Sequence, residues 1–388
     1  MSLGLRGLKN APEAISLLVS QLFARFPFGM LSLAFVIHIQ AITGSYAVAG
    51  IALGAETIGA SVSGPIISRM MAKYGIRRVI TLATIVTVSA LAALAISPPE
   101  PILLVVIALV VGLSSPPIQP AARTIYPQVT PKNLLKSLYS LDATAQEIIW
   151  VLGPLVATLV AAQFGNIPMI LTVAGIQILG TTWFLANKSV GKAKIPKSEA
   201  AVGRVLKNPH VTAVTFIGLL LVGSFAGVEV GSVALFDKAV AGLMFAVFSL
   251  GSIVGGLALG PRVKSKFALP IYLSVMLLGY ALVLVDASNP YWVAGALFIA
   301  GLGVAPSLGA LSLWIATNTS GNETAEAYGW TTTGQLVGFS AGSALAGIGI
   351  DAVSAPAALL VSIVFGLAAI IAAIYAVRNL NPATSLPS

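Results

Sequence analysis

Residues 79–97 read VITLATIVTVSALAALAIS, a stretch of 19 residues without a charged side chain. Arg77 and Arg78 directly precede it, and Pro98 and Pro99 directly follow it. An apolar run of about 20 residues is long enough to cross the hydrocarbon core of a bilayer as an α-helix. A transmembrane barrel would instead alternate apolar and polar residues. The stretch therefore predicts a membrane-spanning helix with helix-breaking or charged residues at its ends.

The composition of the whole chain extends this prediction to nearly all of its length. The chain has 388 residues, of which 57% are hydrophobic and 9% are charged, and its mean hydropathy is +0.97. Soluble domains carry roughly 25% charged residues, so a soluble fold could not hide this much apolar surface. One span and its connection take ~30 residues, which leaves room for about 12 spans. The absence of cysteine excludes disulfides and thiolate chemistry.

Twelve apolar segments are separated by glycine, proline, asparagine and charged residues, and we predict an all-α integral membrane protein with twelve transmembrane helices. The first segment lacks the small-residue cleavage site of a signal peptide, so we expect it to be retained as a helix. The predicted helices cover Ala14–Ala41, Tyr46–Met71, Val79–Ser97, Ile102–Tyr126, Leu138–Phe164, Ile167–Asn187, Val211–Leu235, Val240–Gly260, Ala268–Val285, Tyr291–Ala316, Ala325–Ile350 and Ala355–Val377.

Lysine and arginine are distributed unevenly over the loops between these helices. Of the 21 basic residues, 19 lie before the first helix, after the last helix, in loops that follow even-numbered helices or, as Arg69 and Arg123, within three residues of such a loop. The other loops contain only Lys238, and Arg25 lies within the first helix. Cytoplasmic loops retain lysine and arginine. We therefore predict a multi-pass protein of the bacterial inner membrane with both termini in the cytoplasm.

The longest polar connection, Asn187 to His210, lies in the middle of the chain and carries six basic residues. It predicts an N-terminal six-helix bundle over residues 1–187, a cytoplasmic central loop over 188–210 and a C-terminal six-helix bundle over 211–388. Several glycines and prolines recur between the halves at a nearly constant offset, which indicates a duplicated bundle, with chance alignment as the alternative. The matched residues are Gly59 with Gly251, Gly64 with Gly256, Gly112 with Gly301, and Pro117 with Pro306.

The loop after the second predicted helix, Ser68 to Arg78, reads SRMMAKYGIRR. It resembles the pattern Gly-x-x-x-Asp-Arg-x-Gly-x-Arg-Arg of the major facilitator superfamily, and with the twelve segments the resemblance covers essentially the whole chain. The resemblance implies two six-helix bundles that transport a solute by alternating access. It also implies a gating loop made of Arg69, Lys73, Gly75, Arg77 and Arg78.

Two positions of this loop depart from the superfamily pattern. Ser68 replaces its first glycine, and Ala72 replaces an aspartate that latches the cytoplasmic gate in the superfamily. We therefore expect the latch to be weaker here. In the fourth helix, Ala108 stands where proton-linked members carry arginine. The segments Leu141 to Glu147 and Arg25-Phe26-Pro27 resemble an uncharacterised, actinobacterial-type, efflux-like subgroup.

Charged residues within the predicted helices are the first candidates for a functional site, because a charge at the bilayer centre costs about 3 kcal/mol and needs a partner or a wet cavity. Counting along the helices places Arg25, Glu56 and Glu147 near mid-depth, Asp142 nearer the cytoplasm and Glu229 in the outer part of the seventh helix. We expect the first three to form a centre that couples solute and proton. The alternative is structural: an ion pair of Arg25 with Glu56 or Glu147, and hydrogen-bonded interhelical acids at Glu56 and Glu229.

Uncharged polar residues extend this candidate site. Gln21 lies four residues from Arg25 on the same helical face. Gln119 and Arg123 belong to a polar stripe in the fourth helix, where we interpret Arg123 as an anchor at the cytoplasmic end. The eleventh helix supplies two further candidates, Trp330 and Gln335. The third, sixth, ninth and twelfth helices carry no charge at mid-depth and are expected to act as a scaffold that faces lipid.

The sequence does not indicate an enzyme. It has two histidines, no His-Glu-x-x-His motif and no phosphate-binding loop, so we expect no metal site and no cofactor, with a proton or other ion gradient as energy source. The basic residues behind the net charge of +9 lie in separate loops and not on one solvated face, so we expect no nucleic acid partner. We expect a monomer in the lipid bilayer with a small-molecule substrate. We predict secondary active transport of a small organic solute, as proton-coupled export of an amphiphilic compound. The alternatives are uptake or uniport of a small metabolite, and a non-transporting sensor.

Overall fold

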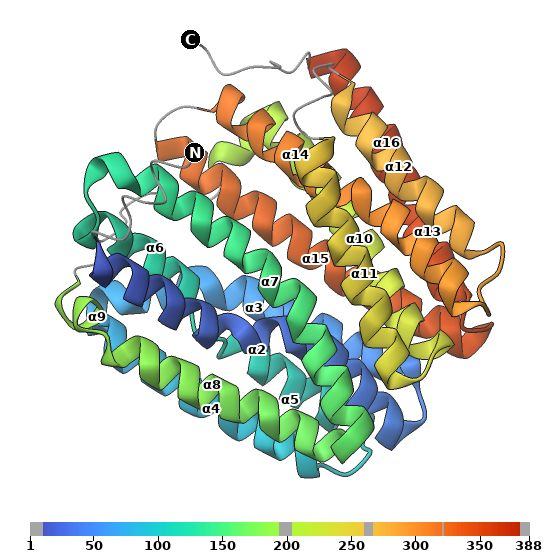
Figure 1. Ribbon diagram of the computed structural model, residues 1–388, viewed down its shortest axis with the longest axis horizontal. Helices are drawn as coiled ribbons and strands as arrows, with labels where there is room; N and C mark the ends of the chain where they lie inside the picture. The colour runs from blue at the N-terminus through green and yellow to red at the C-terminus, as the bar shows by residue number, and fades with distance from the viewer. Residues whose placement is uncertain (1–10, 194–203, 260–266, 320–321, 381–388) are drawn as a thin grey trace.

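The computed structural model describes residues 11–193, 204–259, 267–319 and 322–380, with some side chains inside the helices, including Arg69 and Glu147, left out of the description. These residues form helices and no strand (Figure 1). The helices are α2 (Pro12–Thr43), α3 (Tyr46–Tyr74), α4 (Ile76–Ile96), α5 (Pro101–Leu113), α6 (Ile118–Val129), α7 (Lys132–Phe164), α8 (Asn166–Ala186), α9 (Lys188–Lys192), η1 (Arg204–Lys207), α10 (Pro209–Leu235), α11 (Lys238–Ala258), α12 (Ala268–Val283), α13 (Pro290–Leu302), α14 (Val304–Asn318), α15 (Asn322–Ala352) and α16 (Ala357–Leu380).

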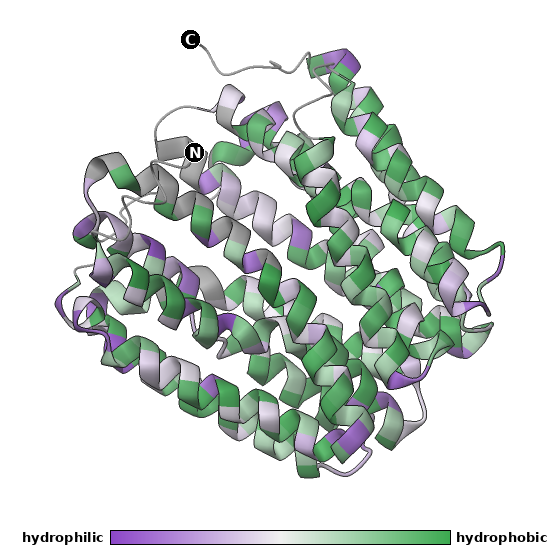
Figure 2. Cartoon of the chain, viewed as in Figure 1, coloured by the Kyte–Doolittle hydropathy of each residue, from purple (hydrophilic) through white to green (hydrophobic). Residues whose placement is uncertain are grey.

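The described helices give twelve spans in sequence order. Nine of them, two built from consecutive helix pairs, are long and apolar enough to cross a membrane. The helices α7 and α12 carry shorter apolar stretches, and α15 completes the set. Figure 2 shows hydrophobic residues along the helices and hydrophilic residues gathered toward their ends. The predicted twelve-helix, all-α membrane fold is confirmed.

Two of the twelve spans are interrupted. The fourth breaks between α5 and α6, where Pro116 and Pro117 stand outside the helices. The tenth breaks at Gly303, between α13 and α14. The predicted span over residues 291–316 is present, but it consists of two helices. Pro306 supplies the physical reason for the break, because it has no N–H to donate to the carbonyl of Leu302.

Matched glycines of the two halves make matched contacts. A Cβ atom at Gly112 in α5 would overlap the backbone carbonyl oxygen of Glu56 in α3. In the second half, a Cβ atom at Gly301 in α13 would overlap the carbonyl oxygen of Phe248 in α11. Glu56 and Phe248 are 192 positions apart, the same offset as the glycine pairs of these two helices. The recurrence in sequence thus corresponds to a recurrence in helix packing, which supports a duplication.

The first six spans pack mainly with one another, and so do the last six. The main contacts between these two bundles join α3 to α15 and α7 to α11. We call the face at which α2 begins and α16 ends the basic face; it lies toward the upper left and top of Figure 1. It also carries the α3–α4 turn, with Lys73, Arg77 and Arg78. The far face is the opposite one, at which α2 ends and α3 begins.

The bundles are joined tightly in the half of the molecule near the far face. One apolar core there contains residues of both bundles, among them Leu53 from α3 and Ile350 from α15. Backbones approach closely along the same seam, since a Cβ atom at Gly50 would overlap the carbonyl group of Ser343. The apolar core of the basic-face half of the first bundle draws its described members from that bundle alone. The described contacts therefore close the far face.

Candidate functional site

The buried carboxylate of Asp142 in α7 collects four polar partners. Its Oδ1 atom accepts a hydrogen bond from Gln21 Nε2 at 2.7 Å and one from the Tyr126 hydroxyl at 3.4 Å. Its Oδ2 atom accepts from Arg123 Nε at 3.1 Å. Arg25 Nη1 lies 3.9 Å from Oδ1 and 3.3 Å from Gln21 Oε1. A charge in an apolar bundle needs such partners, and α2 and α6 supply them to Asp142.

The two ion pairs among the described residues both use Asp142. The alternative that paired Arg25 with Glu56 is therefore corrected, because Arg25 pairs with Asp142. The reason is the direction of the side chain: Cα–Cβ bonds tilt toward the start of a helix, and α2 starts at the basic face. The long arginine side chain reaches back by about one turn, toward the depth of Gln21 and Asp142. A pairing with Glu147 stays a prediction, because the side chain of Glu147 lies outside the described residues.

The structure adds a polar partner to the interpretation of Arg123 as an anchor at the cytoplasmic end. Its guanidinium group is hydrogen-bonded to Asp142, although 44% of the Arg123 side chain stays exposed. The stripe that contains Gln119 and Arg123 therefore makes its described polar contacts with α7. Gln119 confirms this direction, since its Nε2 atom donates to Gln146 Oε1 of α7 at 2.9 Å.

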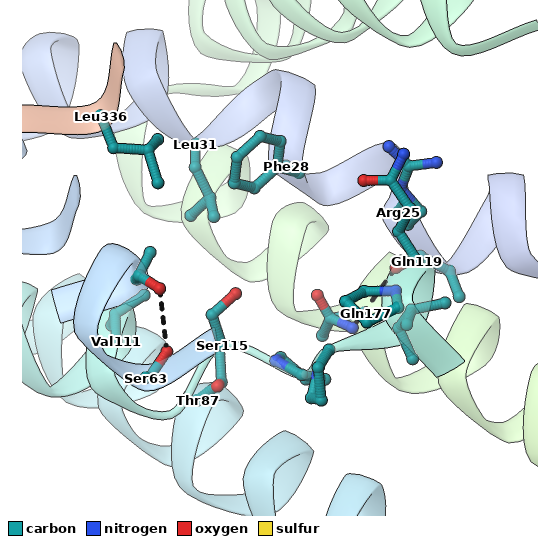
Figure 3. A pocket seen from close by; sticks show the side chains of 16 residues that line it. Arg25, Phe28, Leu31, Ser63, Thr87, Val111, Ser115, Gln119, Gln177 and Leu336 are labelled. Carbon is teal, nitrogen blue, oxygen red and sulfur yellow. Dashed lines mark hydrogen bonds between the residues drawn. The ribbon is translucent and has the colours of Figure 1, made fainter. Parts of the chain in front are cut away.

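A cavity of about 210 Å³ lies at the break between α5 and α6. Figure 3 shows Arg25, Gln119 and Gln177 on one side of it and Ser63 and Ser115 on another. Apolar side chains close the remainder, and one of them comes from the second bundle. These apolar lining residues include Phe28, Leu31, Val111 and Leu336. The cavity thus has one cation, several hydrogen-bonding groups and an apolar wall.

Two residues of this cavity come from helices that we expected to act only as scaffold. Thr87 belongs to α4, the third span, and Gln177 belongs to α8, the sixth. The Gln177 amide donates to Thr181 Oγ1 at 2.9 Å and approaches the Ala24 carbonyl oxygen at 3.4 Å. The scaffold prediction weighed only charges. An uncharged glutamine within an apolar run was the signal that could have identified α8.

The predicted acids lie in three different environments. Glu56 in α3 is buried, with its Oε2 atom 3.3 Å from the Thr57 hydroxyl. Glu229 in α10 is 2% exposed, and its Oε1 atom has no hydrogen-bond partner among the described atoms. The Ser32 hydroxyl of α2, in the other bundle, is within hydrogen-bonding reach of the Glu229 carboxyl group. The side chain of Glu147 lies outside the described residues.

The sequence profile of the Major Facilitator Superfamily matches residues 17–236 and 231–388. The chain belongs to this superfamily. No curated protein matches the chain in sequence. Its fold is similar to that of the nucleoside transporter NupG, with a TM-score of 0.72 at 13% identity over 94% of this chain and 98% of that one.

Two further solved structures of similar fold are bacterial proteins. A homologue of the human drug peptide transporters PepT1 and PepT2 gives a TM-score of 0.71 at 13% identity, over 95% of this chain and 98% of that one. A homologue of the human lysosomal transporter Spinster, in an inward-facing and occupied conformation, gives a TM-score of 0.73 at 15% identity, over 94% of this chain and 96% of that one. At these identities the likeness concerns the fold alone.

The segment predicted as the gating loop lies in the first bundle, where it forms the end of α3, Gly75 and the start of α4. Gly75 has φ of +89° and separates α3 from α4, a backbone conformation that suits glycine. The Arg77 guanidinium lies against Gly191 of α9. Lys73 Nζ lies 5.0 Å from the centre of the Tyr74 ring. The backbone of Arg69 belongs to α3, and Arg78 is exposed.

The candidates from the eleventh span lie apart from Arg25 in this superfamily fold. Gln335 of α15 faces Gly218 of α10, where a Cβ atom would lie 3.3 Å from Gln335 Cγ. Trp330 is half-buried and packs against the apolar core of the second bundle. Of the predicted site residues, the cavity brings together Arg25 and Gln119, with Asp142 behind Arg25. Within the described part of the chain, no cluster of three or more His, Asp or Glu could hold a metal ion.

Proposed function

We propose that this superfamily member is a secondary transporter that carries a small organic solute by alternating access. The observation that supports the proposal best is the cavity beside Arg25 at the interrupted fourth span. Discontinuous helices occur at membrane depth where they line a cavity or are buried in protein. Solute sites of transporters are typically built at such interruptions. The basic face is proposed to be cytoplasmic, so the described state is open toward the cytoplasm or occluded.

The chemistry of the cavity favours a small amphiphilic solute with an acceptor group. Its volume of about 210 Å³ lies below the ~300 Å³ at which drug-sized pockets begin. Arg25 offers N–H donors, since its described bonds engage only Nη1. Phe28 and Leu31, which follow Arg25 along α2, provide an apolar wall beside these donors. A carboxylate or carbonyl group against Arg25, with an apolar body against Phe28, fits this arrangement.

Proton-coupled export is proposed as the mode of transport. Buried acids at the seam between bundles support it, because alternating access changes whether water reaches them. Glu229 lies at that seam, facing Ser32 of the other bundle, and Glu147 is the acid that the sequence places near Arg25. Uptake and uniport are the competing modes, and the absence of arginine at Ala108 is the feature that favours them.

Counterflow in proteoliposomes tests the proposed function. Vesicles are loaded with one unlabelled compound from a panel of aromatic carboxylates, nucleosides and short peptides, and the same labelled compound is added outside. A transporter accumulates the label transiently without an ion gradient. Arg25→Gln should weaken the apparent affinity by about tenfold or more, since hydrogen bonds to a charged group contribute about 1.5–3 kcal/mol.

Arg378→Gln is the matched control, because Arg378 is an exposed arginine in the last turn of α16, outside the cavity. It should leave counterflow unchanged. A compound that stabilises the protein thermally without counterflow would favour the sensor alternative over transport. Counterflow that is equal in Arg25→Gln and in the unmodified protein would show that the solute binds elsewhere.

A further inference from the structure

The carboxylate of Asp351 joins the two bundles at the far face. Asp351 lies in the last turn of α15, in the second bundle, and is exposed. Its Oδ2 atom accepts hydrogen bonds from the Ser45 hydroxyl at 2.5 Å and from the Ala47 backbone N–H at 2.8 Å. Its Oδ1 atom accepts from the Tyr46 backbone N–H at 3.0 Å. All three donors belong to the start of α3, in the first bundle.

These contacts complete the N-terminus of α3. A helix start leaves backbone N–H groups without partners inside the helix and favours negative charge. Ser45 provides one partner from within the chain, because its side chain accepts from the Val48 N–H at 3.1 Å. Asp351 provides partners for the two preceding N–H groups, those of Tyr46 and Ala47. The N-terminus of α3 is thus capped by its own bundle and by the opposite one.

The surrounding contacts make this cap the end of a longer seam. One turn before Asp351, a Cβ atom at Gly347 would overlap the Tyr46 carbonyl group. Further along α15, the Ser343 hydroxyl donates to the Gly50 carbonyl oxygen at 3.2 Å. The Tyr46 hydroxyl donates to the Val233 carbonyl oxygen of α10 at 3.1 Å. Opening at the far face must separate α3 from α15, and the charged cap is then lost.

We infer that Asp351 is a gating residue: its carboxylate, bound to Ser45, Tyr46 and Ala47, holds the far face closed and sets the balance between the two access states. This inference rests on the proposed alternating access. The interaction is charge-assisted and uses two backbone donors of fixed geometry, which makes it stronger than an exposed pair of flexible side chains. The far face thus has an acid between the bundles, Asp351, whereas at the basic face Ala72 stands where the superfamily pattern has aspartate.

This latch works over the physiological pH range. Asp351 lies beyond the predicted span 325–350, at the end of α15. Partial burial alone would raise the pKa of Asp351, but the bonds from Ser45, Ala47 and Tyr46 outweigh it and lower the pKa. A carboxyl with a lowered pKa in the closed state contributes above its ordinary pKa of about 3.9 and loses its contribution as pH falls through the lower value. Among the residues that the structure describes, Tyr46 is a titratable side chain that faces Asp351.

Double electron–electron resonance measures the latch without any solute. The chain has no native cysteine, so spin labels can be placed at Glu100→Cys and Tyr291→Cys, which are exposed far-face positions in different bundles. The unmodified background should give one short distance between labels. Asp351→Asn and Asp351→Ala should add a longer distance, with the ratio of open to closed molecules raised about tenfold, or 1.4 kcal/mol.

Asp286→Asn is the matched control, because Asp286 is a far-face carboxylate that accepts from Ser288 within its own loop. It should leave the distances unchanged. Lowering the pH from 8 to 5 should also leave the distance between the two labels unchanged, because the Asp351 carboxylate stays ionised over this range. If folded Asp351→Asn and Asp351→Ala both keep the single short distance, Asp351 is not a gating residue. If the Asp351 variants shift the label distances but the unmodified protein shows no counterflow, the proposed transport function is overturned and the latch is not.

Discussion

Gln21 Nε2 lies 2.7 Å from Asp142 Oδ1, whereas Arg25 Nη1 lies 3.9 Å from the same oxygen. Asp142 is therefore bound closely by the glutamine and by Arg123, and only loosely by Arg25. An arginine held in this way keeps donors for another acceptor at the cavity. The carboxylate positions Arg25 without saturating it, which is the arrangement that a binding arginine needs.

Asp142→Asn should destabilise the protein by about 3 kcal/mol, in the range for breaking a buried ion pair from one side. The substitution leaves Arg25 and Arg123 facing a neutral amide in a buried site. Thermal unfolding in detergent measures the loss as a lower melting temperature. Asp286→Asn, at a partly exposed loop position, should melt like the unmodified protein. Equal melting of both variants would contradict the structural role given to Asp142.

Gly112→Ala should destabilise the first bundle, because the added Cβ atom would overlap the Glu56 carbonyl oxygen and the helices α3 and α5 would have to move apart. Such overpacking costs roughly 1–3 kcal/mol. Gly175→Ala in α8 is the control, since nothing lies within 4 Å of its Cβ position. It should be neutral or stabilising by about 0.5–1 kcal/mol. Thermal unfolding of the two variants tests this contrast, and equal losses would refute the contact.

The helices could be predicted from sequence because burial in lipid requires long apolar runs with internally satisfied backbones. The partner of Arg25 could not be predicted by the same counting. Depth was assigned to each Cα position, but the Arg25 side chain reaches back toward the start of α2 and meets Asp142. Glu147, five residues later in α7, stands about 7.5 Å farther along the helix axis.

The latch at Asp351 illustrates a second limit. Its donors at Ser45, Tyr46 and Ala47 are 304 to 306 residues away in the chain, and two of them are backbone groups that no side-chain pattern reveals. The sequence did not predict Gln177 as a site residue for a related reason, because a single uncharged amide scarcely alters the hydropathy of a span. Local patterns identify elements, whereas contacts between elements depend on how distant segments meet.

The proposed orientation predicts which residues a membrane-impermeant thiol reagent reaches in intact cells. Glu100→Cys at the far face should react from outside, and Lys207→Cys at the basic face should react only after permeabilisation. The uneven distribution of lysine and arginine is the physical reason. Both positions are exposed, so accessibility within the protein is matched. Reaction of Lys207→Cys from outside intact cells would reverse the proposed topology.

Restoring the acid of the gating loop should oppose the far-face latch. Ala72→Asp places a carboxylate beside the basic residues of the α3–α4 turn, where the superfamily resemblance implies a latch of the basic face. The balance should shift toward molecules closed at the basic face. Spin labels at Gln128→Cys and Thr212→Cys, exposed positions of different bundles, should report a new shorter distance. Ala72→Asn provides the neutral control, and an identical effect of both variants would exclude a charge-based latch.

Glu229 is the acid at which we expect solute and proton to be coupled. A coupling acid must meet water in one access state and lose it in the other. Glu229 is buried at the seam between α10 and α2, where separation of the two bundles would expose it to water. Glu229→Gln keeps the shape of the side chain but cannot release a proton, so solute exchange should survive while transport driven by a pH gradient is lost.

Glu147→Gln tests the acid favoured by sequence in the same assay. Glu56→Gln tests the remaining acid of the centre predicted from sequence, which is also buried but is bonded within the first bundle. Intact pH-driven transport in both Glu229→Gln and Glu147→Gln would exclude these two acids as the coupling group, and a loss confined to Glu56→Gln would place coupling inside the first bundle. Uniport would be the mode if the unmodified protein showed no pH-driven transport.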